Sequence, residues 1–171
     1  MDPFAVLGAE RRFDLDLAAL EKTHRELSRA LHPDKFAQAG ASERKAALEK
    51  AADVNEAWRV VRDPIRRAEA LFTLAGVKVG ETNEPKASPA FLMEMLDDRE
   101  ALAEARAKKD MNRVTELGKR MEARANGVEQ RLAAGFANGG DMASLVPLLG
   151  ELRFYKRFLD EVSAIEEEAL G

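Results

Sequence analysis

The sequence predicts an all-α protein made of two helical domains. Apolar residues recur at the three- and four-residue spacing of helices along most of the 171 residues, and no stretch alternates in the way typical of a strand. Proline, glycine and other turn-forming residues interrupt this spacing at intervals of helical length. Apolar residues make up 46% of the chain and charged residues 34%, which is the balance of an ordinary folded protein.

The first part of the chain predicts a helical hairpin. Its first arm covers residues 16–31 with Asp16 as the N-cap, and its second arm covers residues 42–62 and begins near a Ser42 cap. Two apolar stripes joined by a short connection indicate antiparallel helices that pack at a shallow angle. The stripes consist of Leu17, Leu20, His24, Leu27 and Leu31 on the first arm, and of Ala47, Ala51, Val54, Trp58 and Val61 on the second.

Short helices flank this hairpin. One covers residues 2–8, and we expect its Phe4 and Leu7 to pack on the hairpin. Another follows Pro64, a residue suited to the first turn of a helix, and ends at Gly76. We expect His24 to be a partly buried core histidine, Phe4 and Trp58 to be core residues, and Arg66 and Arg67 to form a solvated face.

The connection between the hairpin arms contains His32-Pro33-Asp34. Pro33 cannot donate a backbone hydrogen bond and pushes His32 away from helical geometry, so the arriving helix must stop here. The resulting turn displays an imidazole and a carboxylate at a defined place. A catalytic pair of His32 and Asp34 is one interpretation, but the turn is expected to be exposed and offers no evident pocket or nucleophile.

The second part of the chain predicts a three-helix bundle. Residues 77–88 are rich in turn-forming residues and lack periodicity, so we place the domain boundary there. Helices are expected at residues 89–108, with Ser88 as the cap, at residues 111–137 and at residues 143–169, where Pro147 leaves the start open. Their stripes include Val114, Leu117, Met121, Val128 and Leu132 on the second helix and Leu145, Leu148, Leu152, Leu159 and Val162 on the third.

The helix at residues 89–108 has apolar residues on two arcs. Phe91, Met95 and Leu102 form the natural core face. A second arc contains Leu92, Leu96 and Ala103 and continues to Met93 and to the acidic residues Asp97, Glu100 and Glu104. A bundle helix needs one buried stripe, so the second arc is either a binding patch rimmed by acids or a widening of the core.

Composition excludes several classes of function. The chain has no cysteine and only two histidines, so disulfides and thiolate sites are excluded and a dense metal site is not expected. The net charge of −4, without a strong basic excess in either half, argues against nucleic-acid binding. No apolar run reaches the length of a membrane span and no targeting segment is evident, so we expect a cytoplasmic protein. A phosphate-binding Gly-x-x-x-x-Gly-Lys-Ser/Thr loop, which would indicate ATP hydrolysis, is missing.

The chain resembles the J domain of DnaJ-type co-chaperones and, more closely, the HscB family of J-type co-chaperones in iron-sulfur cluster assembly. The resemblance covers nearly the whole chain and implies a J domain at residues 1–76, a linker at residues 77–88 and a three-helix client-binding domain at residues 89–171. The motifs that carry it are Asp2-Pro3-Phe4-Ala5-Val6-Leu7-Gly8, His32-Pro33-Asp34-Lys35-Phe36, Val54-Asn55-Glu56-Ala57-Trp58, Asp63-Pro64 and Arg67-Ala68-Glu69.

The resemblance also implies two groups of binding residues. In J-type co-chaperones the His-Pro-Asp turn and a nearby basic stripe engage a heat-shock ATPase, which implies His32, Pro33, Asp34, Lys22, Arg25 and Arg29 here. In HscB proteins a Leu-Met-x-x-Leu helix binds IscU, the scaffold on which clusters are built. The matching positions are Leu92, Met93, Leu96, Asp97, Glu100, Glu104 and Phe154, with Asp97 where a longer glutamate would also fit.

We therefore expect a co-chaperone, not an enzyme, that binds an IscU-type scaffold and delivers it to HscA or DnaK while stimulating that partner's ATPase. A monomer without cofactor or metal is expected, and any cluster would be carried by the partner. Two alternatives stay open. The chain could be a general J-domain co-chaperone with a different client, or a helical adaptor in which the His-Pro-Asp turn is incidental.

Overall fold

The computed structural model describes residues 1–80, 82 and 84–171. The chain forms two compact units, Met1–Val77 and Lys78–Gly171. Every regular element in the described residues is helical, so the all-α prediction is confirmed. The predicted linker at residues 77–88 includes residues 81 and 83, and at these two positions the prediction lies outside the described residues.

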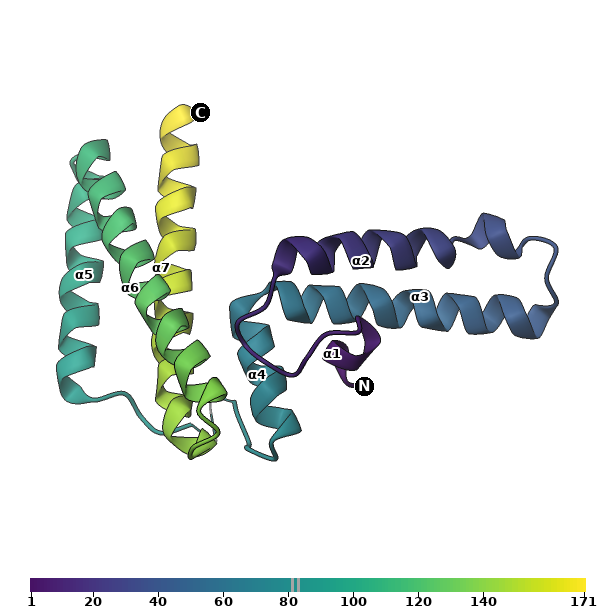
Figure 1. Cartoon of the computed structure of the whole chain (residues 1–171). Coiled ribbons are helices and arrows are strands. Elements are labelled where there is room, and N and C mark those ends of the chain that lie inside the picture. The colour runs from purple at the N-terminus through teal and green to yellow at the C-terminus, as the bar shows by residue number, and fades with distance from the viewer. Residues whose placement is uncertain (81, 83) are drawn as a thin grey trace. The chain divides into compact units, whose positions relative to one another are not determined.

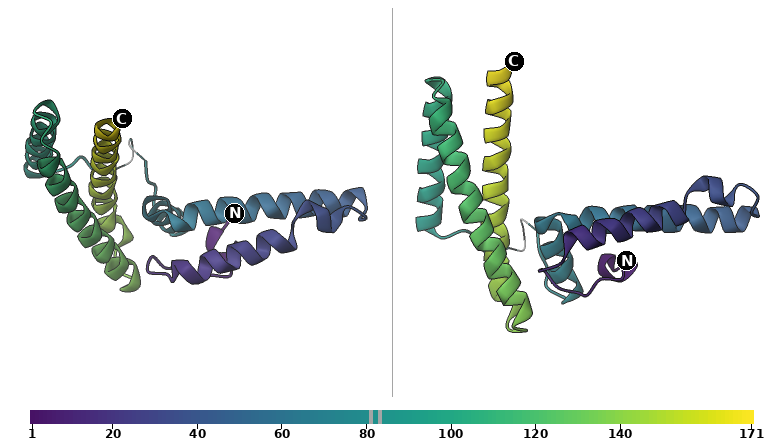
Figure 2. Two further views of the ribbon diagram at one scale, coloured as in Figure 1. Left: turned by 90° about the horizontal axis from the view of Figure 1, so that it is seen from above. Right: turned by 45° about the horizontal axis from the view of Figure 1, so that its top comes forward.

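The first unit is a helical hairpin with short flanking helices. In chain order its elements are α1 (Pro3–Val6), α2 (Leu17–Ala30), the 3-10 helix η1 (Pro33–Phe36), α3 (Ala41–Arg62) and α4 (Pro64–Leu74). Figures 1 and 2 show α2 and α3 side by side in every view, with η1 at the end of the hairpin that lies away from α4. The predicted antiparallel hairpin is therefore confirmed, and its turn is the tip of the unit.

Helix caps explain most of the boundaries. The backbone N–H of Ala19 donates to the Asp16 carboxylate at 3.1 Å, which confirms the predicted cap of α2. The predicted Ser42 cap is wrong. The α3 helix begins at Ala41 after Gly40, whose extended backbone (φ −66°, ψ 163°) serves as the N-cap without a side-chain bond, so Ser42 already lies in the first turn.

The end of α4 shows why Gly76 stands there. Gly76 has a φ of +77°, a conformation that costs other residues free energy because their Cβ crowds the backbone. With this φ, the Gly76 N–H donates to the Thr73 carbonyl at 3.0 Å and the Val77 N–H donates to the Phe72 carbonyl at 2.9 Å. These two bonds add to those that the Ala75 N–H makes to the carbonyls of the last turn.

The core of the first unit lies between α1, α3 and α4. Phe4 and Leu7 are buried, as predicted, beside buried residues of α3 and α4 such as Val61 and Phe72. The predicted α2 stripe is only half-buried, since α2 has no fully buried residue. Trp58 is also half-buried rather than a core residue, and it stacks on the His24 ring with the ring centroids 5.7 Å apart.

Arg67 corrects the expectation of a solvated Arg66-Arg67 face. Arg66 is exposed, but Arg67 is only 7% exposed. The Arg67 guanidinium lies 4.5 Å from the centre of the Phe13 ring and donates to the Val61 carbonyl at 2.7 Å. Arg67 therefore joins the segment before α2 to the end of α3 by a cation–π contact and a buried hydrogen bond.

The second unit is a three-helix bundle. It consists of α5 (Pro89–Ala107), α6 (Met111–Ala137), the 3-10 helix η2 (Met142–Leu145) and α7 (Val146–Leu170). The α6 helix packs against both α5 and α7 (Figures 1 and 2). Pro147 occupies the first turn of α7, where its missing N–H costs no helical hydrogen bond, so α7 begins at Val146 and not at residue 143.

The bundle core confirms the α6 stripe and shifts the α7 stripe. All five predicted α6 residues are buried. On α7, Leu152 and Val162 are buried as predicted, whereas Leu145, Leu148 and Leu159 are half-buried. The other buried residues of α7 are Val146, Leu149, Phe154, Tyr155, Phe158 and Ile165.

A partly buried ion pair joins the segment before α5 to α7. Both carboxylate oxygens of Glu84 accept hydrogen bonds from the Arg153 guanidinium, and Glu84 also accepts from the Gly80 N–H at 3.0 Å. The two side chains are 11% and 17% exposed, so the contact is shielded from water and salt.

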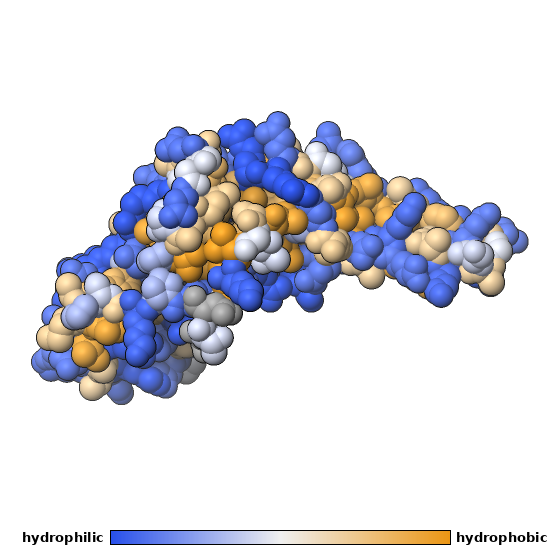
Figure 3. Space-filling model, turned by 90° about the horizontal axis from the view of Figure 1, so that it is seen from below, coloured by the Kyte–Doolittle hydropathy of each residue, from blue (hydrophilic) through white to orange (hydrophobic). Residues whose placement is uncertain are grey.

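The surface is mostly polar. Figure 3 shows one face of the molecule, on which hydrophilic side chains predominate and hydrophobic ones form smaller groups between them. Within the part of the chain that the structure describes, no helix has the length and apolar character needed to span a membrane.

We predict that Gly127→Ala stabilises the second unit. Gly127 lies inside α6, and an added Cβ would meet no atom within 4 Å, so alanine should raise the free energy of unfolding by about 0.5–1 kcal/mol. Gly76→Ala is the control and should lower the stability of the first unit by about 1 kcal/mol because of its positive φ. Urea unfolding followed by circular dichroism checks both, and a loss of stability in Gly127→Ala would contradict the prediction.

Candidate partner-binding surfaces

The hairpin tip presents the His-Pro-Asp turn to solvent. His32, Pro33 and Asp34 are all exposed, and the Asp34 side chain is 92% exposed. The backbone N–H of Asp34 donates to Nδ1 of His32 at 3.2 Å, so His32 caps η1. This bond uses the lone pair of Nδ1, so the neutral ring carries its proton on Nε2. The turn therefore has a defined backbone and a carboxylate available to a partner.

The basic stripe lies on the exposed side of α2. Lys22, Arg25 and Arg29, which the resemblance implied, are exposed. Lys22 lies 4.0 Å from Glu26, and Arg25 lies 3.6 Å from Glu21. Such exposed pairs on one helix contribute little free energy. The two carboxylates nevertheless border the stripe and lower its positive potential.

The exposed face of α5 is apolar. Leu92, Met93 and Leu96 are 46%, 60% and 55% exposed, which places them among the few large hydrophobic side chains on the surface of the described residues. Asp97, Glu100 and Glu104 are also exposed on this helix. The second apolar arc of α5 thus belongs to the surface, as the binding-patch interpretation requires, and it does not widen the core.

Phe154 lies beneath this face and not on it. Its side chain is 4% exposed, although the resemblance implied a contact residue. The Phe154 ring packs edge-on against Phe91 of α5 at 5.9 Å between centroids, and it also contacts Tyr155 and Phe158. Phe154 therefore packs against α5 from below and presents little of its own surface to solvent. Burial also raises the pKa of the Tyr155 hydroxyl, and the nearby Glu151 charge adds to this effect.

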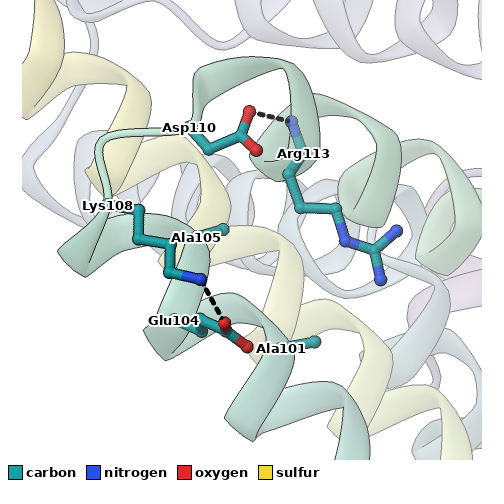
Figure 4. Close-up of a pocket in the computed structure, with 6 residues that line it drawn as sticks. All are labelled: Ala101, Glu104, Ala105, Lys108, Asp110 and Arg113. Atoms are coloured by element: carbon teal, nitrogen blue, oxygen red, sulfur yellow. Dashed lines mark hydrogen bonds and ion pairs between the residues drawn. The ribbon is translucent and has the colours of Figure 1, made fainter.

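Glu104 already has a partner within the chain. The Lys108 ammonium donates to the Glu104 carboxylate at 2.6 Å. This bond and the charge attraction hold the pKa of Glu104 below its usual range and raise the pKa of Lys108. The pair borders a hollow of about 230 Å³ at the turn between α5 and α6 (Figure 4). Its lining consists of Ala101, Glu104, Ala105, Lys108, Asp110 and Arg113.

Two charged residues near the α5 face were missed from the sequence. Asp98 is buried on the core side of α5 and accepts a hydrogen bond from Arg124 of α6 at 2.8 Å. The next residue, Arg99, lies 4.0 Å from Glu161 of α7 and 5.7 Å above the Phe154 ring. The signal was present, since Asp98 follows Met95 by three residues and precedes Leu102 by four, and so lies within the apolar stripe.

Comparisons with known proteins place the chain in a family. A family model described as the HSCB C-terminal oligomerisation domain matches residues 87–163. A co-chaperone protein HscB homolog of Aromatoleum aromaticum is 35% identical over 161 residues, which cover 94% of this chain and 91% of the relative. The chain belongs to the HscB co-chaperone family. The HscB homolog of Cupriavidus taiwanensis is 36% identical over 163 residues, which cover 95% of this chain and 92% of that relative.

Solved HscB structures share the fold. The chaperone HscB from Vibrio cholerae has a TM-score of 0.87 and 28% sequence identity, and the match covers 98% of this chain and 99% of that one. The human co-chaperone HscB has the same TM-score at 23% identity, covering 97% and 82% of the two chains, which shows a common fold. The predicted architecture of a J domain and a C-terminal helical domain is therefore confirmed.

We predict that Phe154→Ala and Leu92→Ala differ sharply in their effect on stability. Removing the buried Phe154 ring should lower the free energy of unfolding by about 3–5 kcal/mol, because the ring leaves a cavity under α5. Leu92→Ala should change it by about 0.5 kcal/mol or less, because the side chain is largely exposed. Urea unfolding checks both variants, and similar losses in the two would show that the α5 face is part of the core.

Proposed function

We propose that this HscB-family chain binds an IscU-type scaffold protein of iron-sulfur cluster assembly and delivers it to a DnaK/HscA-class ATPase, whose ATP hydrolysis it stimulates. The observation that carries the proposal is the exposure of Leu92, Met93 and Leu96 on one helix, in a chain that also displays His32-Pro33-Asp34 on a separate unit. Two exposed sites on two units suit a protein that joins two partners.

The hairpin tip is proposed to act on the ATPase. The Asp34 carboxylate can accept charge-assisted hydrogen bonds from an arginine of the ATPase, and bidentate pairing would fix the direction of approach. Pro33 and the bond between the Asp34 N–H and His32 hold the turn, so little ordering is needed on contact. Stimulation also requires that the tip bind one conformation of the ATPase better than another, because equal binding shifts no equilibrium.

The basic stripe of α2 is proposed to orient this encounter. Lys22, Arg25 and Arg29 would face an acidic surface of the ATPase. Attraction between exposed charges is screened by salt over roughly 10 Å at an ionic strength of 0.1 M. The association rate should therefore fall as salt is added.

The α5 face is proposed to hold the scaffold. Leu92, Met93 and Leu96 would form the desolvated centre of the contact, and Asp97 and Glu100 would lie at its rim. A fitting partner presents an apolar patch beside basic residues. Glu104 would contribute at the rim while keeping its bond to Lys108, and Phe154 would support α5 from below.

The remaining features of the proposal concern the cluster, the location and the division of the chain. The chain has no cysteine, so a cluster would be held by the scaffold rather than by thiolates of this protein. We propose a cytoplasmic monomer whose residues 1–76 act as the J domain and whose residues 89–171 bind the client.

We predict that Asp34→Asn abolishes stimulation of the ATPase without changing the fold. The amide keeps the size of the carboxylate but loses the charge, and the exposed side chain holds no core contact. Single-turnover ATP hydrolysis by an HscA- or DnaK-class chaperone measures the effect. Asp53→Asn, which removes an exposed carboxylate from α3, is the matched control and should stimulate normally. Full stimulation by Asp34→Asn would overturn the role of the turn.

We predict that Leu92→Ser combined with Leu96→Ser weakens binding of an IscU-type scaffold at least about tenfold, because both side chains lose their apolar contact area. Calorimetric titration measures the affinity, and circular dichroism should show unchanged helix content. Leu48→Ser, at another exposed leucine on α3, is the control. Unchanged affinity in the double variant would remove α5 as the scaffold site.

A further inference from the structure

The two apolar arcs of α5 are related by a shift of one residue. Phe91, Met95 and Leu102 face the core side, while Leu92, Leu96 and Ala103 are their immediate successors and are exposed. Successive residues of an α-helix are about 100° apart around its axis. Turning α5 by that angle would therefore bring Leu92, Leu96 and Ala103 to the places that Phe91, Met95 and Leu102 now occupy. Over the first half of α5, hydrophobic burial alone discriminates poorly between the two settings, because Leu92 and Leu96 could take the places of Phe91 and Met95. Further along the helix the observed setting is favoured, because Ala103 and Arg106 would take the places of the buried Leu102 and Ala105.

Asp98 and its successor Arg99 are related by the same one-residue shift, and they carry opposite charges. In the observed setting Asp98 faces the bundle and bonds Arg124 at 2.8 Å, with the two side chains 10% and 35% exposed. Turning α5 would bring Arg99 toward the place of Asp98, so that two cations would face each other. Attraction would become repulsion in a partly dry site, where charge interactions are stronger than in water.

Ion pairs between α5 and α7 also favour the observed setting of α5. Arg99 lies 4.0 Å from Glu161 of α7, and Arg106 donates two bonds to Glu168 of α7 at 3.1 Å. Both pairs are exposed and individually weak. The Asp98–Arg124 contact is the more buried one, and it joins α5 to the other neighbouring helix, α6.

We propose that the Asp98–Arg124 pair is a rotational lock on α5. It selects the setting in which Leu92, Met93 and Leu96 face solvent, so Asp98 is a positioning residue for the α5 face. Charged pairs shielded from water can specify one packing arrangement among several apolar ones, and Asp98, at 10% side-chain exposure, is the shielded member of this pair. The consequence for scaffold binding rests on the proposed function, whereas the lock itself does not.

The test reverses the sign of the charge at position 124. In Arg124→Glu, Asp98 would face a like charge in the observed setting, and Arg99 would face an opposite charge in the turned one. The absence of native cysteine allows single-cysteine reporters, Leu96→Cys on the exposed arc and Leu102→Cys on the buried one. The rate of maleimide labelling at each reporter measures which arc is exposed.

The expected result is a change of labelling in opposite directions. With Arg124 present, the Leu96→Cys reporter labels fast and the Leu102→Cys reporter labels slowly. Arg124→Glu should reduce the ratio of the two rates at least about tenfold, by slowing the first and speeding the second. Arg124→Lys keeps the charge and should keep the ratio. Arg120→Glu makes the same charge change at an exposed α6 position that pairs with Glu116, and should also keep the ratio.

Other outcomes overturn the lock. Rates that stay within about twofold in Arg124→Glu, or that both increase together, would mean that the pair does not select the setting of α5. If circular dichroism shows that Arg124→Glu is unfolded, Arg124→Gln decides, since it removes the attraction without adding repulsion. In Arg124→Gln, the labelling rate at Leu96→Cys divided by that at Leu102→Cys should then fall. An unchanged ratio in that variant overturns the proposal.

Calorimetry with an IscU-type scaffold separates this proposal from the proposed function. A scaffold that binds the wild-type chain should bind Arg124→Glu at least about tenfold more weakly, and undiminished binding would contradict the lock. If the wild-type chain does not bind the scaffold, the proposed function fails. The labelling ratio then still decides on the lock.

Discussion

The second unit depends on which side of α5 is buried. Because α5 is apolar on two arcs, burial of one arc leaves three large hydrophobic side chains in water, an arrangement that a helix selected only for stability would avoid. The aromatic layer of Phe91, Phe154, Tyr155 and Phe158 fills the space beneath the buried arc. The exposed arc is therefore supported by a dense core while taking no part in it.

The first unit separates its framework from its contact surface in a different way. Its buried residues come from α1, α3 and α4 and from Leu7 and Phe13 between α1 and α2. Arg67 ties the segment before α2 to the end of α3. The tip is defined locally, by a proline and by a backbone bond to His32. The geometry of the turn thus follows from a few adjacent residues and does not require a buried core around them.

The sequence predicted elements better than it predicted which apolar residues are buried. The caps at Asp16 and Ser88 were readable because a side chain makes the cap, whereas the cap at Gly40 depends on backbone geometry alone. Adjacent apolar pairs such as Leu148-Leu149 and Phe154-Tyr155 leave the phase of a helix ambiguous, and contacts with the other helices decide it. Arg67 was misjudged because its ring partner, Phe13, is distant in sequence. Asp98 was missed although its place within the apolar stripe was readable, and only its partner Arg124 is distant in sequence. The exposure of Leu92 and Leu96 agreed with one of two interpretations that periodicity left open.

The half-buried stripe of α2 has a consequence for hydrogen exchange. A helix without a fully buried side chain exposes little new apolar surface when it opens, so its local opening costs less free energy than that of a helix such as α6. The amides of α2 should therefore exchange through openings confined to the hairpin, while those at the centre of α6 exchange only when the bundle unfolds. The arm that carries the basic stripe is thus the part of the hairpin that binding can order most.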